Sequence, residues 1–310
     1  MDSWHPEYQA PGSTGRGRAQ DHEGMASHRS PQRAELAEFL RAMRARLRPE
    51  DVGLPGTDRR RTPGLRRQEV AQLAAVSIDW YIRLEQGRVG TPGAAVLDAV
   101  AQALRLSPSE RTHLHLVARD ETPVSRHLSA PVGDSLRVLL AGMPLIPAYV
   151  VDFRFDVLAH NAAATALFGA DFGTAGETTG NTARVLFLAP RMRESQLDWV
   201  RVARETVGNL RANLARHPDD PRLREVITDL RDHSAEFAAW WEDHTVQRRA
   251  HGRKRVVDPV VGELAVCYDT LATRDDSDQC LIAVTPADPA AEDGFRRLMS
   301  GPGLHAIGAA

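Results

Sequence analysis

The side chains with the clearest potential for chemistry lie between residues 78 and 83. They are Ile78, Asp79, Ile82 and Arg83, which share one face of a helix that begins near Ser77. Arg83 could bond both acceptors of a guanine, Asp79 could accept from a cytosine amino group, and Ile78 could touch a thymine methyl. Asp79 has a second interpretation, as a negative charge placed at the positive end of the helix dipole.

A second group of side chains precedes this face and suits phosphate contacts. It consists of Arg59, Arg60, Arg61, Arg66 and Arg67. Guanidinium groups bond phosphate in bidentate geometry, and such contacts position a protein on DNA without reading its sequence. We expect replacement of Arg60 to weaken binding to all sequences alike and to flatten the salt dependence by about 0.9 per lost contact. A solvated arginine loop is the alternative interpretation.

No comparable set of residues indicates catalysis or metal binding. The sequence has no Gly-rich phosphate loop and no nucleophile elbow. His113 and His115 are two residues apart, so on a helix they point about 200° away from each other and cannot chelate together. His244, His251 and Cys267 have no recognised zinc spacing. We therefore expect neither enzymatic activity nor a metal site, and no cofactor.

Two short helices must position the candidate base-reading residues. Ala71 is small enough for a close helix crossing, and Ser77 is a good N-cap for the second helix, whose opening turns would point into the major groove. Gly87 ends that helix. The apolar positions that would lock the pair onto other helices are Val70, Leu73, Val76, Tyr81 and Leu84. An ordinary helical hairpin is the alternative, but the basic flank favours a helix-turn-helix.

Three further helices complete an all-α domain at residues 30–119. Ser30 and Pro31 can start the first, whose apolar face consists of Leu36, Phe39, Leu40, Met43 and Leu47. Another helix spans about 93–104. The last is predicted for 107–119, where Ser107 and Glu110 form a capping box.

Charge divides the chain into two parts. Residues 29–119 hold 16 Arg and 10 Asp or Glu, a balance of +6, whereas residues 120–310 have a balance of −6. A basic block beside an acidic block suits one domain that faces a polyanion, although chance clustering on two solvated surfaces gives the same count. Lys254 is the only lysine.

The sequence has no segment that would place the protein in or across a membrane. No apolar stretch approaches the roughly 18 residues that span a bilayer, and the N-terminus lacks an apolar signal core. There are two cysteines. We expect a cytoplasmic protein without a membrane partner.

The C-terminal part mixes strands and helices. Strands are predicted for 148–153, 157–159, 263–270 and 279–285, with long helical stretches at about 191–216 and 222–249. The expected domain boundaries are a disordered tail at 1–29, a linker at 120–133, a second domain at 134–300 and a tail at 301–310. The fold class is therefore α+β.

The segment from Gln68 to Gly87 resembles the helix-turn-helix of XRE/Cro-type regulators. Its pattern of Gln, Val-Ala, Val-Ser, Tyr and Leu-Glu-x-Gly matches theirs. More narrowly, residues 47–55, 59–71 and 80–88 resemble the actinobacterial MmyB-like regulators. The resemblance continues through Asn181-x-x-Arg184-x-x-Phe187, Asp198-Trp199, Ser234-Ala235-Glu236-Phe237 with Trp240-Trp241-x-x-His244, and Pro259-x-x-Gly262.

This resemblance implies a five-helix, lambda-repressor-like domain followed by a PAS-like α/β sensor domain. It places helix 77–86 in the major groove of double-stranded DNA, with Ile78, Asp79, Ile82 and Arg83 as base contacts. Gln68 stands where the family contacts phosphate, and Ser77 joins the phosphate-contacting arginines. A single module contacts little DNA, so we expect a homodimer on a palindrome. The implied function is a ligand-controlled, sequence-specific transcription regulator.

The sensor domain has the aromatic side chains to enclose a small apolar ligand, such as a fatty-acyl-like molecule. Candidate ligand-binding residues are Arg184, Trp199, Phe237, Trp241 and Tyr268. Arg184 could pair with a carboxylate head group, or with a neighbouring acid of the protein. The aromatic residues could equally be core. A protein-interaction module in this half, or an enzyme fused to a DNA-binding domain, are the alternative functions.

Three residues depart from the family pattern. Ala75 stands at a turn position where glycine is usual, which would cost about 1 kcal/mol if the turn requires a left-handed backbone. Asp258 replaces the usual histidine before Pro259, and Thr245 replaces the usual aspartate after His244. Ligand chemistry that depends on those two side chains is not expected here.

Overall fold

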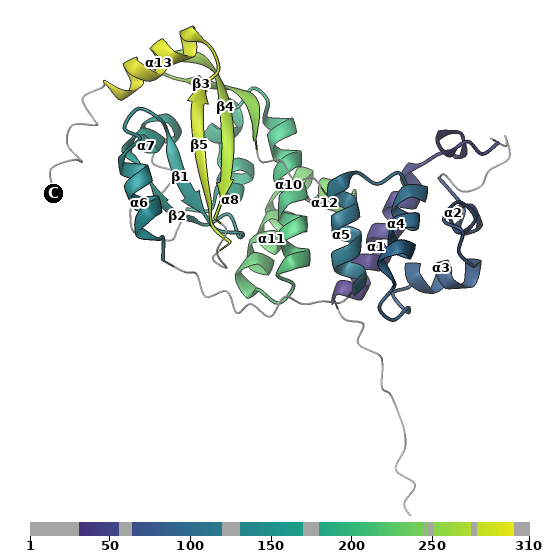
Figure 1. Cartoon of the computed structure of the whole chain (residues 1–310). Helices are drawn as coiled ribbons and strands as arrows, with labels where there is room; N and C mark the ends of the chain where they lie inside the picture. Colours follow the sequence, from purple (N-terminus) through teal and green to yellow (C-terminus); the bar gives the residue numbers. More distant parts are fainter. Residues whose placement is uncertain are drawn as a thin grey trace, which may run out of the picture.

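The computed structural model contains a helical domain and an α/β domain that lie side by side (Figure 1). It describes residues 31–55, 64–119, 131–169, 180–244, 246, 251–273 and 278–300. Within these ranges no helix is long and apolar enough to cross a membrane. The expected tails, most of the expected linker, Ser30, Arg59, Arg60, Arg61 and Thr245 lie outside the described residues.

In its described residues, 31–55 and 64–119, the N-terminal domain has five α-helices and one 3-10 turn. They are α1 (Pro31–Arg46), η1 (Pro49–Val52), α2 (Arg67–Leu73), α3 (Ile78–Glu85), α4 (Ala94–Ala103) and α5 (Pro108–Arg119). Most of the predicted apolar positions meet in one core, where Phe39, Tyr81 and Leu114 are fully buried. The expectation for Leu73 was wrong: its side chain is exposed and lies outside this core. Ser107 Oγ accepts from the Glu110 amide and the Glu110 carboxylate accepts from the Ser107 amide, which confirms the predicted capping box. The all-helical architecture expected for this part is confirmed.

The turn between α2 and α3 has the left-handed backbone that glycine usually provides. Ala75 has a φ of 52°, and the Ser77 hydroxyl that follows accepts from the Trp80 amide at 3.1 Å to begin α3. Gly87 ends the motif with a φ of 64°, where a Cβ would lie 2.6 Å from the Arg33 carbonyl oxygen. The turn thus tolerates alanine at one end and requires glycine at the other.

Replacing Ala75 with glycine should therefore stabilise the protein. We expect the free energy of unfolding to rise by about 0.5–1 kcal/mol, because relief of the left-handed strain exceeds the added entropy of the unfolded chain. Urea denaturation measures the change. The matched control is Ala99→Gly inside α4, which should lose about 1 kcal/mol. Destabilisation by both substitutions would contradict the strain at Ala75.

The C-terminal domain is built on one antiparallel sheet of order β2-β1-β5-β4-β3. Its strands are β1 (Ala148–Val151), β2 (Val157–His160), β3 (His251–Asp258), β4 (Gly262–Ala272) and β5 (Cys280–Pro286). The helices are α6 (Asp134–Ala141), α7 (Ala162–Phe168), α8 (Thr182–Leu188), α9 (Pro190–Ser195), α10 (Trp199–Arg216), α11 (Pro221–His233), α12 (Ala235–Glu242) and α13 (Pro289–Met299). The α+β class is confirmed.

Both long helices predicted for this domain are wrong in extent. The first is interrupted at residues 196–198, because Gln196 bridges Val256 and the Leu197 amide donates to the Arg255 carbonyl on β3. The second is split at Ser234, whose hydroxyl caps α12 by accepting from the Phe237 amide. Strand β3 was not predicted at all. Edge pairing and side-chain capping, which helical periodicity does not reveal, decided these boundaries.

Helix α10 joins the two domains. Ala212, Ala215 and Val246 belong to the same buried cluster as the N-terminal core residues, whereas Leu210 and Val207 of the same helix belong to the core of the C-terminal domain. Figure 1 shows α10 and α12 directly beside α5 and α1. The helical domain is thus packed against the C-terminal domain through α10.

Candidate functional site

The outer face of α3 carries the residues expected to read bases. Ile78, Asp79 and Arg83 are exposed, and Ile82 is half-buried. Tyr81 and Leu84, on the opposite face, are fully buried in the helical core. Because Ile78 keeps 42 % of its surface exposed, the face is open to a large partner rather than covered by the C-terminal domain.

The candidate phosphate contacts differ in their freedom to reach DNA. Arg66 and Gln68 are exposed at the start of α2, beside α3. Arg67 is also exposed, with 46 % of its side chain accessible, although its guanidinium donates to Glu85 at 3.0 and 2.9 Å. Ser77 is exposed, and its hydroxyl accepts the N-capping bond of α3. Both described arginines of this group, Arg66 and Arg67, are therefore accessible to a phosphate.

Glu85 is the buried centre of the helix-turn-helix. It is 2 % exposed and accepts from Arg44 of α1 at 2.9 and 3.1 Å and from Arg67 of α2. Burial, followed by the nearby charge of Glu85, raises the pKa of the Tyr81 phenol. The Glu85 carboxylate at the end of α3 thus connects α3 with α1 and α2, a role that its sequence position did not reveal.

Only one of the five predicted ligand-binding residues lines the large cavity of the C-terminal domain. Trp199, Phe237 and Trp241 are buried in the core. The Trp199 indole donates to the Leu186 carbonyl at 2.9 Å, and Arg184 pairs with Glu225 at 3.1 Å and with Asp229 at 2.6 Å. Tyr268 does line the cavity. The core and salt-bridge alternatives therefore describe the other four residues.

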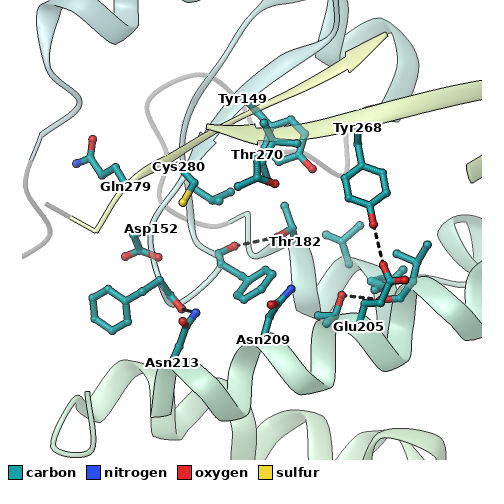
Figure 2. A pocket seen from close by; sticks show the side chains of 18 of the residues that line it. Tyr149, Asp152, Thr182, Glu205, Asn209, Asn213, Tyr268, Thr270, Gln279 and Cys280 are labelled. Atoms are coloured by element: carbon teal, nitrogen blue, oxygen red, sulfur yellow. Dashed lines mark hydrogen bonds between the residues drawn. The ribbon is translucent and has the colours of Figure 1, made fainter. Parts of the chain in front are cut away.

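The cavity has a volume of about 500 Å³ and lies between the sheet and α10. Its walls include apolar side chains from β1, α7, α8 and β5. Six α10 residues complete the wall, namely Val202, Glu205, Thr206, Asn209, Asn213 and Arg216. Figure 2 shows Tyr149 and Tyr268 projecting from the sheet toward Glu205 and Asn209. The size is that of a typical small-molecule site.

The chain's only lysine lines this cavity. Lys254 lies on β3, is 8 % exposed, and has its Nζ 5.8 Å from the ring centres of Phe168 and Tyr268. Among the described residues, no carboxylate lies within ion-pairing distance of Nζ and no acceptor bonds it. Burial, followed by the charge of Arg201, lowers the pKa of Lys254 to about 8. A buried ammonium without an ion-pair partner, stabilised only in part by the charge of Glu205, suits an anionic group of a ligand.

The nearest acid already has partners. Glu205 accepts from the Tyr268 hydroxyl at 2.7 Å and pairs with Arg201 at 3.0 Å (Figure 2). Burial and the Glu205 hydrogen bond raise the pKa of Tyr268 to about 12, so the phenol stays a donor at neutral pH. The polar end of the cavity therefore offers a cation and a fixed tyrosine.

Lys254 was missed as a site residue because its strand was missed. Its neighbours Arg253 and Arg255 are exposed, so the inward position is visible only once the alternation of β3 is known. The sole signal in the sequence was that Lys254 is the one lysine in a chain that otherwise uses arginine.

Two families of known proteins match the chain. A family described as "MmyB-like transcription regulator ligand binding domain" matches residues 132–298, more than half of the chain, and one described as "Helix-turn-helix domain" matches residues 35–114. No curated protein matches it significantly. The exposed face of α3 lies within the second match and the cavity within the first. The chain therefore belongs to the MmyB-like transcription regulators, as a DNA-binding regulator with a helix-turn-helix domain followed by a ligand-binding domain.

Proposed function

We propose that this regulator controls transcription in response to an amphiphilic monoanion, such as a fatty acid, bound in the cavity of its C-terminal domain. The observation that carries the proposal is the buried, unpaired ammonium of Lys254 in a cavity of about 500 Å³ with mainly apolar walls. Burying a charge without a partner is costly, so such a charge indicates a partner that arrives with the ligand. The acyl chain would occupy the apolar part and the carboxylate the polar end.

Dodecanoate tests the ligand class. We expect it to bind more tightly than dodecan-1-ol, which fills the same apolar space without a charge, and much more tightly than dodecyltrimethylammonium. Isothermal titration calorimetry compares the three. Equal affinity for all three would contradict a site built for an anion. Mass spectrometry of the denatured protein would also reveal an acid that copurifies with it.

A protein-interaction role for the C-terminal half is the second candidate. Val138, Leu139 and Leu145 are exposed on and just after α6, and apolar surface of this kind can bind a partner. If none of the three amphiphiles binds while a protein partner copurifies, this candidate replaces the ligand proposal.

For DNA, the proposed base contacts are Ile78, Asp79, Ile82 and Arg83, and the proposed phosphate contacts are Arg66, Arg67, Gln68 and Ser77. Exposure of the α3 face supports the first set, and exposure at the starts of α2 and α3 supports the second. Arg59, Arg60 and Arg61 remain proposed phosphate contacts on sequence grounds. The active form is a homodimer on a palindrome, which sedimentation analysis can test, and it acts in the cytoplasm, where DNA is accessible.

Arg83→Ala should remove discrimination at a single base pair. We expect a loss of about 1–3 kcal/mol on the preferred sequence and little change on random DNA, because a bidentate guanine contact exists only on the preferred sequence. Arg66→Ala is the matched control, since an exposed phosphate contact should weaken both DNAs alike and lower the salt slope by about 0.9. Fluorescence anisotropy at several salt concentrations separates the two patterns. Equal losses on both DNAs for Arg83→Ala would refute base reading by this residue.

A further inference from the structure

A buried polar cluster joins the helix-turn-helix domain to the ligand-binding domain. It consists of Glu35 on α1, His113 on α5, Arg211 on α10 and His244 just after α12, and we refer to it as the interdomain cluster. Arg211 is 1 % exposed, and its Nη1 donates to Glu35 Oε1 at 2.6 Å and lies 2.8 Å from His244 Nδ1. The guanidinium also donates to the Trp241 carbonyl and stacks 4.3 Å above the Trp241 ring centre.

The groups around Glu35 keep its carboxylate ionised. Burial alone would raise its pKa, but hydrogen bonds from His113 and His244 and the charge of Arg211 hold the pKa well below its usual value. Glu35 thus remains an anion across the working pH range. The ion pair between Glu35 and Arg211 joins residues 176 positions apart in the chain.

Helix α10 places the interdomain cluster directly behind the cavity. Val202, Glu205 and Asn209 line the cavity, together with Thr206, Asn213 and Arg216. Arg211 follows Val202 by nine residues, which at 3.6 residues per turn is about 180° around the helix. A helix moves as a rigid element, so a ligand that displaces its cavity face also displaces Arg211.

The hydrogen bonding of the interdomain cluster is incomplete. Arg211 Nε and His113 Nδ1 are buried, and neither has a hydrogen-bond partner in the described part of the chain. His244 has a φ of 49° and follows the C-cap of α12, a position where the left-handed conformation is common. Buried polar atoms without partners are rare in native proteins and call for an explanation, such as a second arrangement of the contact.

We propose that Arg211 is the positioning residue that transmits ligand occupancy of the cavity to the orientation of the helix-turn-helix domain. The inference rests on the proposed ligand-binding function. Because the reading face of α3 stays open, the ligand acts by reorienting the domain and not by covering it. In a dimer on a palindrome, reorientation changes how well the two reading helices match the spacing of the half-sites.

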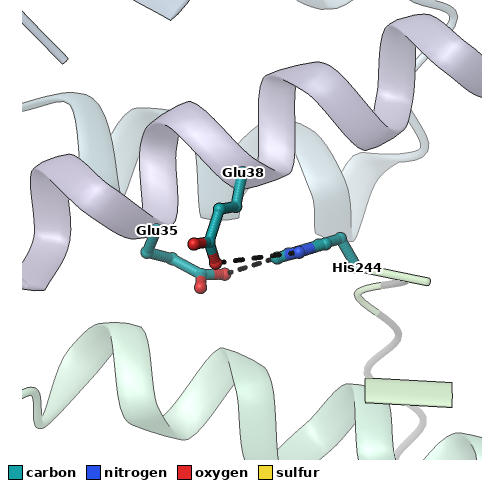
Figure 3. A group of neighbouring side chains, drawn as sticks. All are labelled: Glu35, Glu38 and His244. Atoms are coloured by element: carbon teal, nitrogen blue, oxygen red, sulfur yellow. Dashed lines mark ion pairs between the residues drawn. The ribbon is translucent and has the colours of Figure 1, made fainter. Parts of the chain in front are cut away.

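The same place also offers a group of possible metal ligands. Glu35, Glu38 and His244 present one ligand atom each within 4.8 Å of one another (Figure 3). The guanidinium of Arg211, however, occupies the space between Glu35 and His244 and would repel a cation. The geometry therefore favours the ion pair between Glu35 and Arg211, which we call the lock, over a metal site. The experiment distinguishes the two by testing for metal dependence.

The experiment uses Arg211→Met and the milder Glu35→Gln in the full chain, with Arg204→Met as a matched control. Arg204 is an exposed arginine of α10 whose ion pair with Asp243 is long, at 3.5 Å. Calorimetry gives the dissociation constant of dodecanoate, and anisotropy gives the DNA affinity with and without it. In the wild type and the control, dodecanoate should change the DNA affinity at least fivefold. In both cluster variants that ratio should fall toward one, while the dodecanoate affinity changes less than twofold.

A measurement without ligand tests the role of Arg211 independently of the proposed fatty-acid ligand. Hydrogen exchange across residues 31–46 should accelerate at least tenfold in Arg211→Met and in Glu35→Gln, but not in the control. If the wild type fails to bind dodecanoate yet exchange accelerates, the ligand proposal fails and the lock stands. An unchanged ligand effect in folded cluster variants, unchanged exchange, or a DNA affinity that depends on zinc and is reset by EDTA would overturn the role of Arg211.

Discussion

Lys254→Met should make the ligand-free protein more stable and at the same time abolish its preference for anionic ligands. Burial lowers the pKa of Lys254 from 10.5 to about 8, a difference worth roughly 3 kcal/mol of unfavourable burial at neutral pH. Methionine has a similar length and no charge, so we expect a gain of about 1–3 kcal/mol in the free energy of unfolding. Urea denaturation at pH 7 measures this gain.

The pH dependence has a definite sign. Between pH 8 and 10.5 the lysine is protonated in the unfolded chain but largely neutral in the folded one, so the unfolded state binds more protons. Stability conferred by this site therefore rises with pH across that window. The destabilisation caused by burying the protonated lysine is complete below pH 8 and is relieved above pH 10.5. Subtracting the stability of Lys254→Met from that of the wild type at each pH isolates this contribution, which should shrink in magnitude from pH 7 to pH 10.

Binding should change in the opposite direction from stability. Dodecanoate offers the buried ammonium a partner, so its affinity should fall at least tenfold in Lys254→Met, whereas dodecan-1-ol should bind both proteins alike. Arg253→Met is the matched control, because Arg253 precedes Lys254 on β3 and its side chain is exposed. That control should alter neither stability nor affinity. A variant that loses stability, or one that retains the preference for the acid over the alcohol, would remove Lys254 from the site.

The contrast between the two domains explains what the sequence could reveal. The helix-turn-helix depends on local signals: Ser77 caps a helix eight residues long, Gly87 ends the motif, and Ser107 and Glu110 cap each other three residues apart. Each of these signals is local, and the capping hydrogen bonds join residues three positions apart. The exposed face of α3 could therefore be predicted residue by residue.

The cavity depends on long-range pairing that no local pattern records. Lys254 faces inward because β3 pairs with β4 in one register, and a shift of one residue would turn Arg253 or Arg255 toward the cavity instead. Aromatic type was also a poor guide, since Trp199 and Phe237 fill the core beside the cavity rather than lining it. Likewise, nothing near Arg211 in the sequence indicates its pairing with Glu35.

The second large effect is expected at Glu85, whose carboxylate compensates two guanidinium groups. Glu85→Ala leaves Arg44, only 13 % exposed at its side chain, without its anion. Removing one partner of a buried pair costs about 3–5 kcal/mol, so thermal unfolding should occur at a clearly lower temperature. Glu85→Gln keeps an acceptor and should lose about half as much. Glu263→Ala, which breaks an exposed pair with Arg255, is the control and should change stability by less than about 0.5 kcal/mol.

The same substitution separates stability from DNA contact. In the wild type the Arg67 guanidinium is exposed but donates twice to Glu85, so this ion pair competes with a phosphate for Arg67. Glu85→Gln lowers the charge that retains Arg67, and binding to random DNA should become tighter and more salt-dependent even though the fold is weaker. The double variant Glu85→Gln with Arg67→Ala should lose that gain. If random-DNA affinity instead falls with stability, the ion pair with Glu85 does not limit the contact of Arg67 with the DNA backbone.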